Sequence, residues 1–356
     1  MEATRRGFIT GMAAPLILGA ANKSGSKKPI VGTGAHTYEV THDWGELPAS
    51  IAWGNTHGVV EDSQGQIYVH HTVNKVSQTA DTMVVFDAKG KFVRSWGKEF
   101  RGVAHGLSIR KEGPTEYLYI TANATNPRLT PQPELQAVVL KATLKGEIVW
   151  KIQGPPDVAE YKTPNADGSA KRYNPTNLAI APNGDIYVGD GYGSSYVNQY
   201  DKAGKYIRTF GGRGAAAGQL AEPHGIWMDM RGKTPILTVA DRANGRLQRF
   251  DLEGKHIDFV QGVTKPCHFD EHKGDVVVPD LQGKVTLLDK DNKVITYLGD
   301  AGAASMNDLT PIRVKSRDAF TPGKFVCPHG ACFDHKGNIF VVEWVEVGRV
   351  TKLRRV

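Results

Sequence analysis

The sequence predicts an all-β protein, a six-bladed β-propeller, from three observations. The chain has 356 residues, which exceeds the usual size of one hydrophobic core and suits a fold that grows by repetition. One pattern of short strands recurs six times from Ile51 onward. The copies contain glycine-centred turns of the kind that join antiparallel strands, as in Asp87 to Lys91. Radial repetition of four-stranded blades is the architecture that fits all three.

Each copy opens on a short polar or histidine-containing segment, which a glycine-centred turn separates from a strand rich in Ile, Tyr and Val. Successive copies start 43 to 71 residues apart, which is close to one blade each. The copies begin at His57, His105, Thr176, His224, Cys267 and His329. Insertions lengthen the second and fifth copies, and we expect them to form loops at one rim. These insertions are Ala122 to Pro133, Pro155 to Lys171 and Ala301 to Pro322. We expect residues near Tyr38 to Trp44 to complete the last blade and close the ring.

The net charge of +7 does not indicate a nucleic-acid partner. Much of it comes from basic residues at the two ends of the chain: Arg5, Arg6, Lys23, Lys27, Lys28, Lys352, Arg354 and Arg355. The sequence has no basic helix and no stripe of basic and aromatic residues. We therefore expect no nucleic-acid binding.

The first residues resemble a twin-arginine signal peptide. Arg5 and Arg6 precede an apolar run from Gly11 to Leu18, and small residues follow it. The run is shorter than the about 20 residues that a membrane span requires, so we expect no stable span. The alternative is a merely basic N-terminus. We predict a signal peptide over 1–21, a linker over 22–36 and the propeller over 37–356, with export to the periplasm or secretion.

Three cysteines cannot make a disulfide framework, because at most one pair can form. Cys267 and Cys327 fall near the channel mouth, whereas Cys332 lies further along its strand. From sequence they remain open as metal ligands, a disulfide or small hydrophobic residues.

The first residue of each copy begins an innermost strand, so its side chain is expected to point into the channel at one mouth. Blades two, four and six contribute His105, His224 and His329, and alternate blades of a six-fold ring form a triangle. Three neutral imidazoles leave an open coordination position, as in catalytic zinc sites, and suit other divalent transition metals too. Each histidine could instead only fill its blade. The role of His57 stays open.

Polar residues also follow the second strand of each blade, at the same mouth. They are His70, His71, Asn123, Asp190, Asp241, Asp280 and Glu343. We expect most of the acids to bind backbone donors between blades. Tyr192 and Arg242 stand out as candidates for chemistry, because a tyrosine beside a metal can move protons and an arginine fork binds a carboxylate. Packing at the rim is the alternative for both.

Three motifs resemble the NHL-repeat propeller of peptidyl-α-hydroxyglycine α-amidating lyase. They are Pro223-His224-Gly225, Gly189-Asp190-Gly191-Tyr192 and the stretch from Val239 to Gln248, and the likeness runs from about Ile51 to the C-terminus. That lyase cleaves the C–N bond of an α-hydroxyglycine, giving a peptide amide and glyoxylate. The resemblance implies zinc on His105, His224 and His329, with Tyr192 and Arg242 as catalytic residues. The family's first-blade arginine falls near His70-His71, which makes His71 a third catalytic candidate.

The sequence departs from the family at two further positions. Gly330 replaces the acidic residue that the family uses for a structural calcium, and Gly193 replaces a disulfide cysteine. We expect a monomeric, metal-dependent, lyase-like enzyme for a small or peptide-derived hydroxylated substrate. The alternatives are a metal-dependent lactonase or other hydrolase, and a non-catalytic propeller that binds a ligand or a protein partner.

Overall fold

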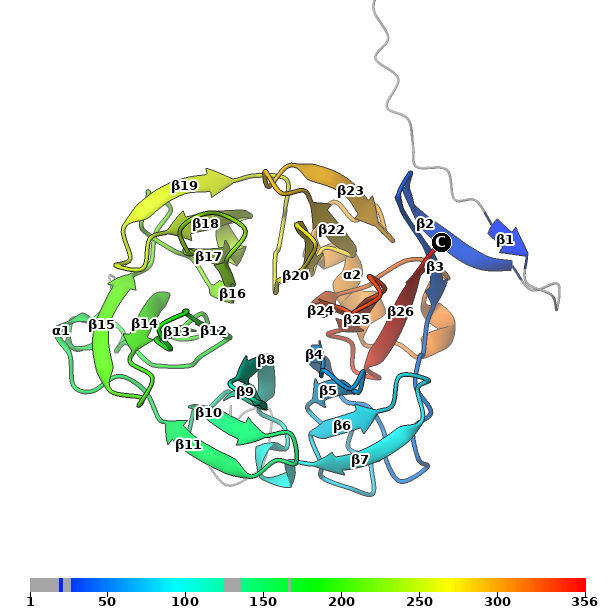
Figure 1. The fold of residues 1–356 in the computed structure, drawn as a ribbon, viewed down its shortest axis with the longest axis horizontal. Coiled ribbons are helices and arrows are strands. Elements are labelled where there is room, and N and C mark those ends of the chain that lie inside the picture. The colour runs from blue at the N-terminus through cyan, green and yellow to red at the C-terminus, as the bar shows by residue number, and fades with distance from the viewer. Residues whose placement is uncertain (1–18, 22–26, 125–135, 166–167) are drawn as a thin grey trace, which may run out of the picture.

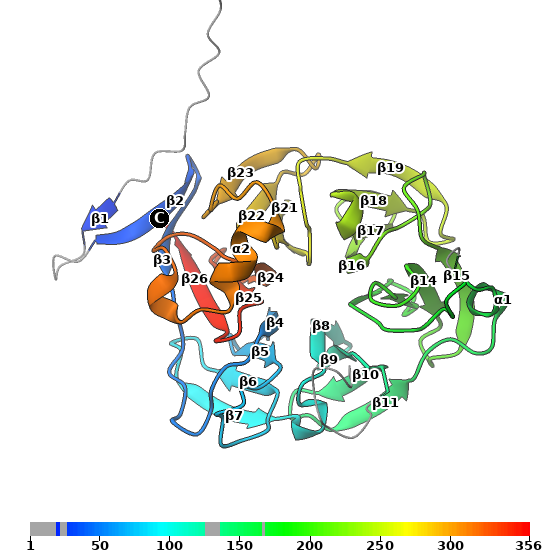
Figure 2. The same cartoon turned by 180° about the vertical axis from the view of Figure 1, so that it is seen from behind.

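Six antiparallel sheets surround a central channel (Figure 1), which confirms the predicted six-bladed β-propeller. The computed structural model describes residues 19–21, 27–124, 136–165 and 168–356. In every blade the strand nearest the channel is the one that carries the first residue of the repeat or follows it closely (Figures 1 and 2). The channel mouth is therefore built from six equivalent positions.

Blades 1 to 5 each contain four strands in chain order. Blade 1 holds β4 (Thr56–Glu61), β5 (Ile67–His71), β6 (Met83–Phe86) and β7 (Phe92–Trp96). Blade 2 holds β8 (Ala104–Glu112), β9 (Thr115–Ala122), β10 (Val138–Thr143) and β11 (Ile148–Ile152). Blade 3 holds β12 (Leu178–Ile180), β13 (Ile186–Gly189), β14 (Tyr196–Tyr200) and β15 (Tyr206–Gly211). Blade 4 holds β16 (Pro223–Asp229), β17 (Ile236–Asp241), β18 (Arg246–Phe250) and β19 (His256–Val260). Blade 5 holds β20 (Asp270–His272), β21 (Asp275–Asp280), β22 (Lys284–Leu288) and β23 (Val294–Leu298).

Blade 6 joins the two ends of the described chain and closes the ring. It contains β24 (Pro328–Phe333), β25 (Ile339–Glu343) and β26 (Arg349–Arg355), followed outward by β3 (His36–Thr41), β2 (Lys27–Thr33) and β1 (Gly19–Ala21). The pairing of β26 with β3 sets Leu353 opposite Val40. The expected clasp is thus a real strand. Strand β3 covers the edge of β26, which would otherwise be left unpaired in blade 6.

The region expected to be a linker, residues 22–36, contributes part of this sheet. Strand β2 pairs with β3 through a tight hairpin in which Gly34 has a positive φ of 55°. Glycine at the start of a two-residue turn allows this backbone without a Cβ penalty. The expected signal peptide over 1–21 falls mostly outside the described residues, apart from β1.

The insertion from Ala301 to Pro322 is not only loop. It forms α2 (Met306–Arg313) and a 3₁₀ turn at Arg317–Ala319. Ser305 begins α2 with a capping box, in which its side chain accepts from the Asn307 N–H and Asp308 bonds back to the Ser305 N–H. The insertion from Pro155 to Lys171 contains the one-turn α1 (Ala159–Lys162). Residues 125–135 of the remaining insertion lie outside the described residues.

The hydrophobic core lies between neighbouring blades. Between blades 1 and 2, for example, Met83 and Val85 pack against Leu107, Leu118 and Ile120, all almost fully buried. Each such side chain contributes about 1.5–3 kcal/mol by leaving water. Every blade therefore depends on both neighbours. In the described part of the chain, no helix is long and apolar enough to cross a membrane.

Cutting the chain after Lys315 should abolish cooperative folding. The cut removes β24, β25 and β26, so β3 loses its partner and blades 5 and 1 each lose the face that packs on blade 6. Thermal unfolding followed by circular dichroism should show no cooperative transition. A chain ending at Arg354 is the control, because it keeps the pairing of Leu353 with Val40. A soluble Lys315-ended chain that melts like the full chain would contradict a closed ring.

Candidate metal centre

Four histidines lie in β-bulges at the start of innermost strands. The register of the inner strand shifts between Thr56 and Gly58, Ala104 and Leu107, Pro223 and Ile226, and Pro328 and Gly330. His57, His105, His224 and His329 fall within these shifts. A bulge adds a residue to one strand and re-aims its side chain. The repeated bulge explains how four separate blades present a histidine at the same level of the channel.

The glycine after each histidine is required by close packing against the next blade. A Cβ on Gly106 would lie 2.6 Å from the carbonyl oxygen of Thr176, and one on Gly225 would lie 2.7 Å from that of Cys267. A side chain at either position would push the blades apart. This is the physical reason for the His-Gly pair in the sequence.

The same carbonyl oxygens orient the three histidines predicted as metal ligands. Nδ1 donates to the carbonyl of Thr176 in His105 (2.6 Å), of Cys267 in His224 (2.7 Å) and of His57 in His329 (2.9 Å). A carbonyl oxygen can only accept, so Nδ1 must carry the proton in all three rings. Each Nε2 therefore keeps its lone pair. Backbone bonds of this kind fix the tautomer of metal-binding histidines.

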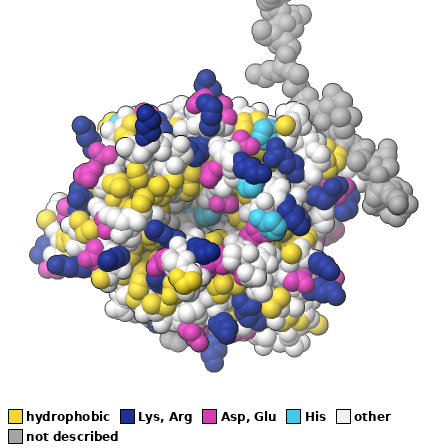
Figure 3. All heavy atoms as spheres, viewed as in Figure 1, with side chains coloured by type: hydrophobic (Ala, Val, Ile, Leu, Met, Phe, Trp, Pro, Cys, Tyr) yellow, Lys and Arg dark blue, Asp and Glu magenta, His cyan; other side chains and the backbone are white. Residues whose placement is uncertain are grey.

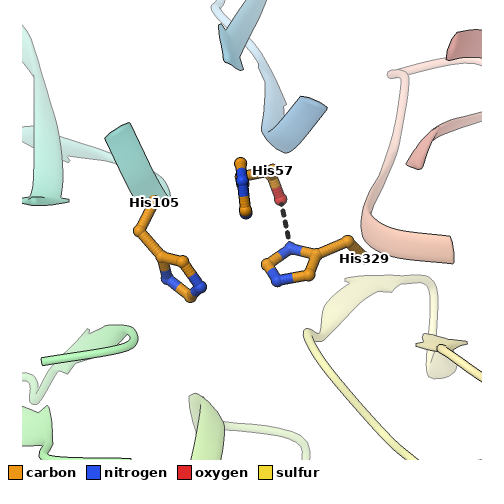
Figure 4. Close-up of side chains that lie close together, drawn as sticks. All are labelled: His57, His105 and His329. Carbon is orange, nitrogen blue, oxygen red and sulfur yellow. Dashed lines mark hydrogen bonds between the residues drawn. The ribbon is translucent and has the colours of Figure 1, made fainter. Parts of the chain in front are cut away.

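The structure brings the predicted tripod together. The ring centroids of His105, His224 and His329 lie 4.7–4.9 Å from one another. His57, whose role the sequence left open, lies in the same cluster (Figure 4). The donor atoms of His57, His105 and His329 all lie within 4.8 Å of one another, and the predicted ligand His224 is not part of that group.

The Tyr192 hydroxyl lies against two of these rings and has too few protons to bond to both ring nitrogens. The hydroxyl oxygen lies 3.2 Å from Nε2 of His105 and 3.1 Å from Nε2 of His224. It has one proton and can satisfy only one of these lone pairs. Nε2 of His329 is buried and has no hydrogen-bond partner among the described residues. A buried acceptor without a donor costs about 1–3 kcal/mol. The protein does not supply a donor for each of these three nitrogens, whereas a metal ion could accept their lone pairs.

The imidazoles are neutral at physiological pH. Burial lowers the pKa of His105 to about 3, and it lowers the pKa of His224 and His329 well below the usual value. Burial also raises the pKa of Tyr192, while the charge of Arg242 opposes that rise. Tyr192 is 39% exposed as a whole although its hydroxyl lies among the rings, so it forms part of the rim.

Two arginines add positive charge to the site. Arg242 is buried, its Nη1 lies 3.4 Å from the Tyr192 hydroxyl, and its Nε lies 3.3 Å from a carboxylate oxygen of the partly exposed Glu222. Arg313 of α2 donates to Asn55 and to the Trp344 carbonyl. Burial is the main cause of the low pKa of His57, and the charge of Arg313 adds a smaller contribution. Sequence reasoning missed Arg313, because only the fold brings the insertion to this mouth.

His71 lies outside the cluster of tripod rings, whereas the buried His70 lies close enough to His105 to affect its pKa. Nδ1 of His71 accepts from the N–H groups of Gly54 and Val73, both at 3.2 Å, and the ring packs edge-on against Trp53. Burial lowers the pKa of His71 to about 3 and of His70 to about 4. The Nδ1 contacts of His71 hold the loop after β5, while its Nε2 is buried without a hydrogen-bond partner among the described residues.

The carboxylates that end second strands bind backbone donors, but within their own blade and not between blades as expected. The segment leading into each inner strand donates an N–H to the carboxylate of its own blade: Asn174 to Asp190, Ala221 to Asp241, Thr264 to Asp280 and Val326 to Glu343. Each bond fixes the chain just before a first-position residue. The carboxylates therefore position the site without entering it.

The cysteines are all buried and free. Cys267 lies near Arg242, with its sulfur 3.9 Å from Nη1, and packs in one cluster with Cys327. Burial raises the pKa of both thiols to about 12. Among the described residues, none of the three cysteines belongs to the group of donor atoms that could hold a metal.

A cavity of about 750 Å³ lies at the other end of the channel. Its lining comes from later residues of the inner strands, such as Glu61, Arg110, Met228 and Glu271, and includes none of the four site histidines. Figure 3 shows this end as a hollow with acidic and histidine side chains nearby, whereas α2 lies on the opposite face (Figure 2). The donor chemistry, and not cavity size, thus locates the candidate site.

Replacing His71 with alanine should lower stability and leave metal content unchanged. The change strands the N–H groups of Gly54 and Val73, which costs about 1–3 kcal/mol of the free energy of unfolding. Chemical denaturation and elemental analysis would measure the two effects. Loss of turnover with unchanged stability would instead support a catalytic role for His71.

Comparisons with known proteins agree with this fold, although no family model matches the chain. Peptidyl-α-hydroxyglycine α-amidating lyase 1 of Drosophila melanogaster is 26% identical over 243 residues, which cover 60% of this chain and 40% of the fly protein. Peptidyl-glycine α-amidating monooxygenase of Mus musculus is 28% identical over 51% of this chain and 17% of its own length. The matches thus span less than half of either relative.

A solved structure of virginiamycin B lyase from Staphylococcus aureus, described as catalytically inactive and in complex with quinupristin, shares the fold. It is 16% identical, with a TM-score of 0.53 over 89% of this chain and all of that one. At this identity the likeness concerns the fold alone. The chain is a six-bladed β-propeller that resembles peptidyl-α-hydroxyglycine α-amidating lyases in sequence.

Proposed function

We propose that the chain is a metal-dependent lyase for a small hydroxylated substrate, with peptidyl-α-hydroxyglycine cleavage as the nearest named activity. One observation carries the proposal: Nε2 of His105 and Nε2 of His224 both lie against the Tyr192 hydroxyl, which has a single proton, and Nε2 of the adjacent His329 ring is buried without a hydrogen-bond partner among the described residues. The partial likeness to the amidating lyases supports the choice of reaction.

His105, His224 and His329 would hold a divalent transition metal, with zinc the first choice because neutral imidazoles suit it. When bound, such a metal supplies Lewis-acid polarisation of a substrate oxygen. Gly330 offers no carboxylate next to His329, so we propose no calcium here.

Tyr192 would move the proton. In cleavage of an α-hydroxyglycine, the hydroxyl proton leaves, its O–H electron pair forms the new carbonyl, and the C–N pair passes to the departing amide nitrogen. Tyr192 can give its proton to that nitrogen and take the one from the hydroxyl, so it ends unchanged. Its position against two of the three imidazoles suits this transfer.

Arg242 would hold the carboxylate of the substrate. Its guanidinium is buried beside Tyr192, and its neighbour Glu222 is partly exposed, so a substrate carboxylate can replace that contact. Arg313 adds a second cation near His57. This charge favours a small or peptide-derived anion as the substrate.

We also propose export by the twin-arginine route to the periplasm or the exterior. Arg5 and Arg6, followed by a short apolar run, support it. These residues lie outside the described part of the chain.

Metal content should fall when any one of the three ligands is lost. His105→Ala, His224→Ala and His329→Ala should each weaken or abolish metal binding and turnover, whereas Tyr192→Phe should keep the metal and slow turnover by about 10²–10⁴-fold. Elemental analysis and release of glyoxylate from an α-hydroxyglycine peptide would measure these effects.

His256→Ala is the matched control for this series, because His256 lies on the outer strand β19 and packs against Phe250 and Phe259. A full equivalent of tightly bound metal in every tripod variant would contradict the ligand set. Turnover of lactones with none of α-hydroxyglycines would contradict the lyase assignment.

Changing both Arg5 and Arg6 to lysine should keep the protein in the cytoplasm, because a receptor reads the arginine pair and not the bulk charge. Cell fractionation would measure it. The control changes Lys27 and Lys28 to arginine, which preserves charge outside the motif. Export at the normal level in the Arg5, Arg6 variant would count against the route.

A further inference from the structure

His57 occupies the same bulge position in blade 1 as the tripod histidines occupy in blades 2, 4 and 6. Its ring centroid lies 4.9 Å from that of His105 and 4.5 Å from that of His329. Figure 4 shows the three rings around one central space. The donor atoms of these rings lie within 4.8 Å of one another, which is close enough for His57 to share a metal ion with His105 and His329.

The hydrogen bonds between neighbouring blades do not use the side chain of His57. In the even blades, His105, His224 and His329 donate Nδ1–H to first-position carbonyls of the odd blades. In the odd blades the first-position carbonyl accepts this bond, and the first-position side chain makes a bond of a different kind or none. Thr176 donates its hydroxyl to the carbonyl of Pro223, and Cys267 donates its thiol to that of Lys265.

The ring of His57 has no such partner. Its Nδ1 is buried without a hydrogen bond among the described residues, and the whole residue is 8% exposed. A buried, unpaired ring nitrogen costs about 1–3 kcal/mol unless another group satisfies it. A valine would fill this position without that cost, because its side chain has no polar atom. The imidazole therefore suits a ligand that the protein atoms alone do not supply.

His57 and Tyr192 approach the cluster from different sides. Tyr192 contacts His105 and His224, whereas His57 contacts His105 and His329. His57 lies in β4 of blade 1, whereas Tyr192 lies in the turn between β13 and β14 of blade 3, so the two residues come from blades that are not neighbours. His57 therefore adds a donor without displacing the tyrosine.

We infer that His57 is a fourth metal ligand, so that this chain holds its divalent metal on four imidazoles drawn from blades 1, 2, 4 and 6. The inference rests on the proposed function, which supplies the other three ligands. Four neutral nitrogen donors suit zinc, copper and nickel and leave the full charge of the metal in place. Catalytic zinc sites can expand to five donors, so a fourth imidazole does not exclude a substrate.

Cobalt(II) loaded into the purified full chain tests this directly. His57→Ala should still bind one equivalent through the remaining three ligands, but at least about 10-fold more weakly, since even the loss of a residue that only supports a ligand costs 10–100-fold. The visible absorption of the bound cobalt should change, and added imidazole should restore it. Competition with a chelator measures the affinity.

Two further variants keep the test decisive. His57→Gln guards against a folding defect in the alanine variant and should show the same weaker binding. His268→Ala is the matched control, because His268 is a buried histidine of blade 5 whose Nδ1 bonds to the Ala331 carbonyl and which lies outside the donor group. It should bind cobalt like the original chain.

The outcomes separate this inference from the proposed function. Unchanged affinity and spectrum in both His57 variants would overturn the fourth ligand and leave the tripod intact. Metal retained in His224→Ala but lost in His57→Ala would place the metal on His57, His105 and His329, overturning both assignments. An original chain that binds no cobalt would overturn the proposed function itself, and the fourth ligand with it.

Discussion

The rest of this structure depends on the contact that the start of the inner strand makes with the next blade in blades 2, 4 and 6. At that contact a glycine lets two backbones meet, and a histidine nitrogen bonds to the carbonyl oxygen that the approach brings near. The same contact packs the blades, sets the tautomer and aims the imidazoles inward. Moving one blade outward would break the packing, the hydrogen bond and the donor geometry together. Fold and candidate chemistry therefore share one constraint.

Alternate blades differ at this contact. The first-position histidines of blades 2, 4 and 6 donate to the first-position carbonyls of blades 3, 5 and 1, whereas Nδ1 of His57 in blade 1 has no partner among the described residues. The sequence shows the resulting three-fold pattern, so the tripod could be predicted from register alone. The likeness of His57 to the other three was equally visible in the sequence. What could not be read there is that its ring nitrogen lacks a partner, because that depends on the side chains of other blades.

The blades and the closing strand were predictable because each repeat carries its own strand pattern and turns. The misses came from segments without a repeat. Lys27–Thr33 has no blade of its own and becomes a strand only because β3 offers a free edge. The helix α2 was expected as loop, although Ser305 and Asp308 form its capping box. The position of Arg313 near the site follows from that helix, and no spacing in the sequence could reveal it.

The four imidazoles also connect the two ends of the described chain. His57 follows β3 in sequence, His329 begins the last blade, and the bond from His329 Nδ1 to the His57 carbonyl crosses the junction where the ring closes. A metal held by both residues would bind the closed ring and not an opened one. At a free metal concentration 100 times the dissociation constant, such binding adds about 2.7 kcal/mol to stability. The pairing of β3 with β26 closes the same junction on the outside of blade 6. That strand pair and the metal would therefore both resist separation of blade 6 from blade 1, one at the outer edge and one at the channel.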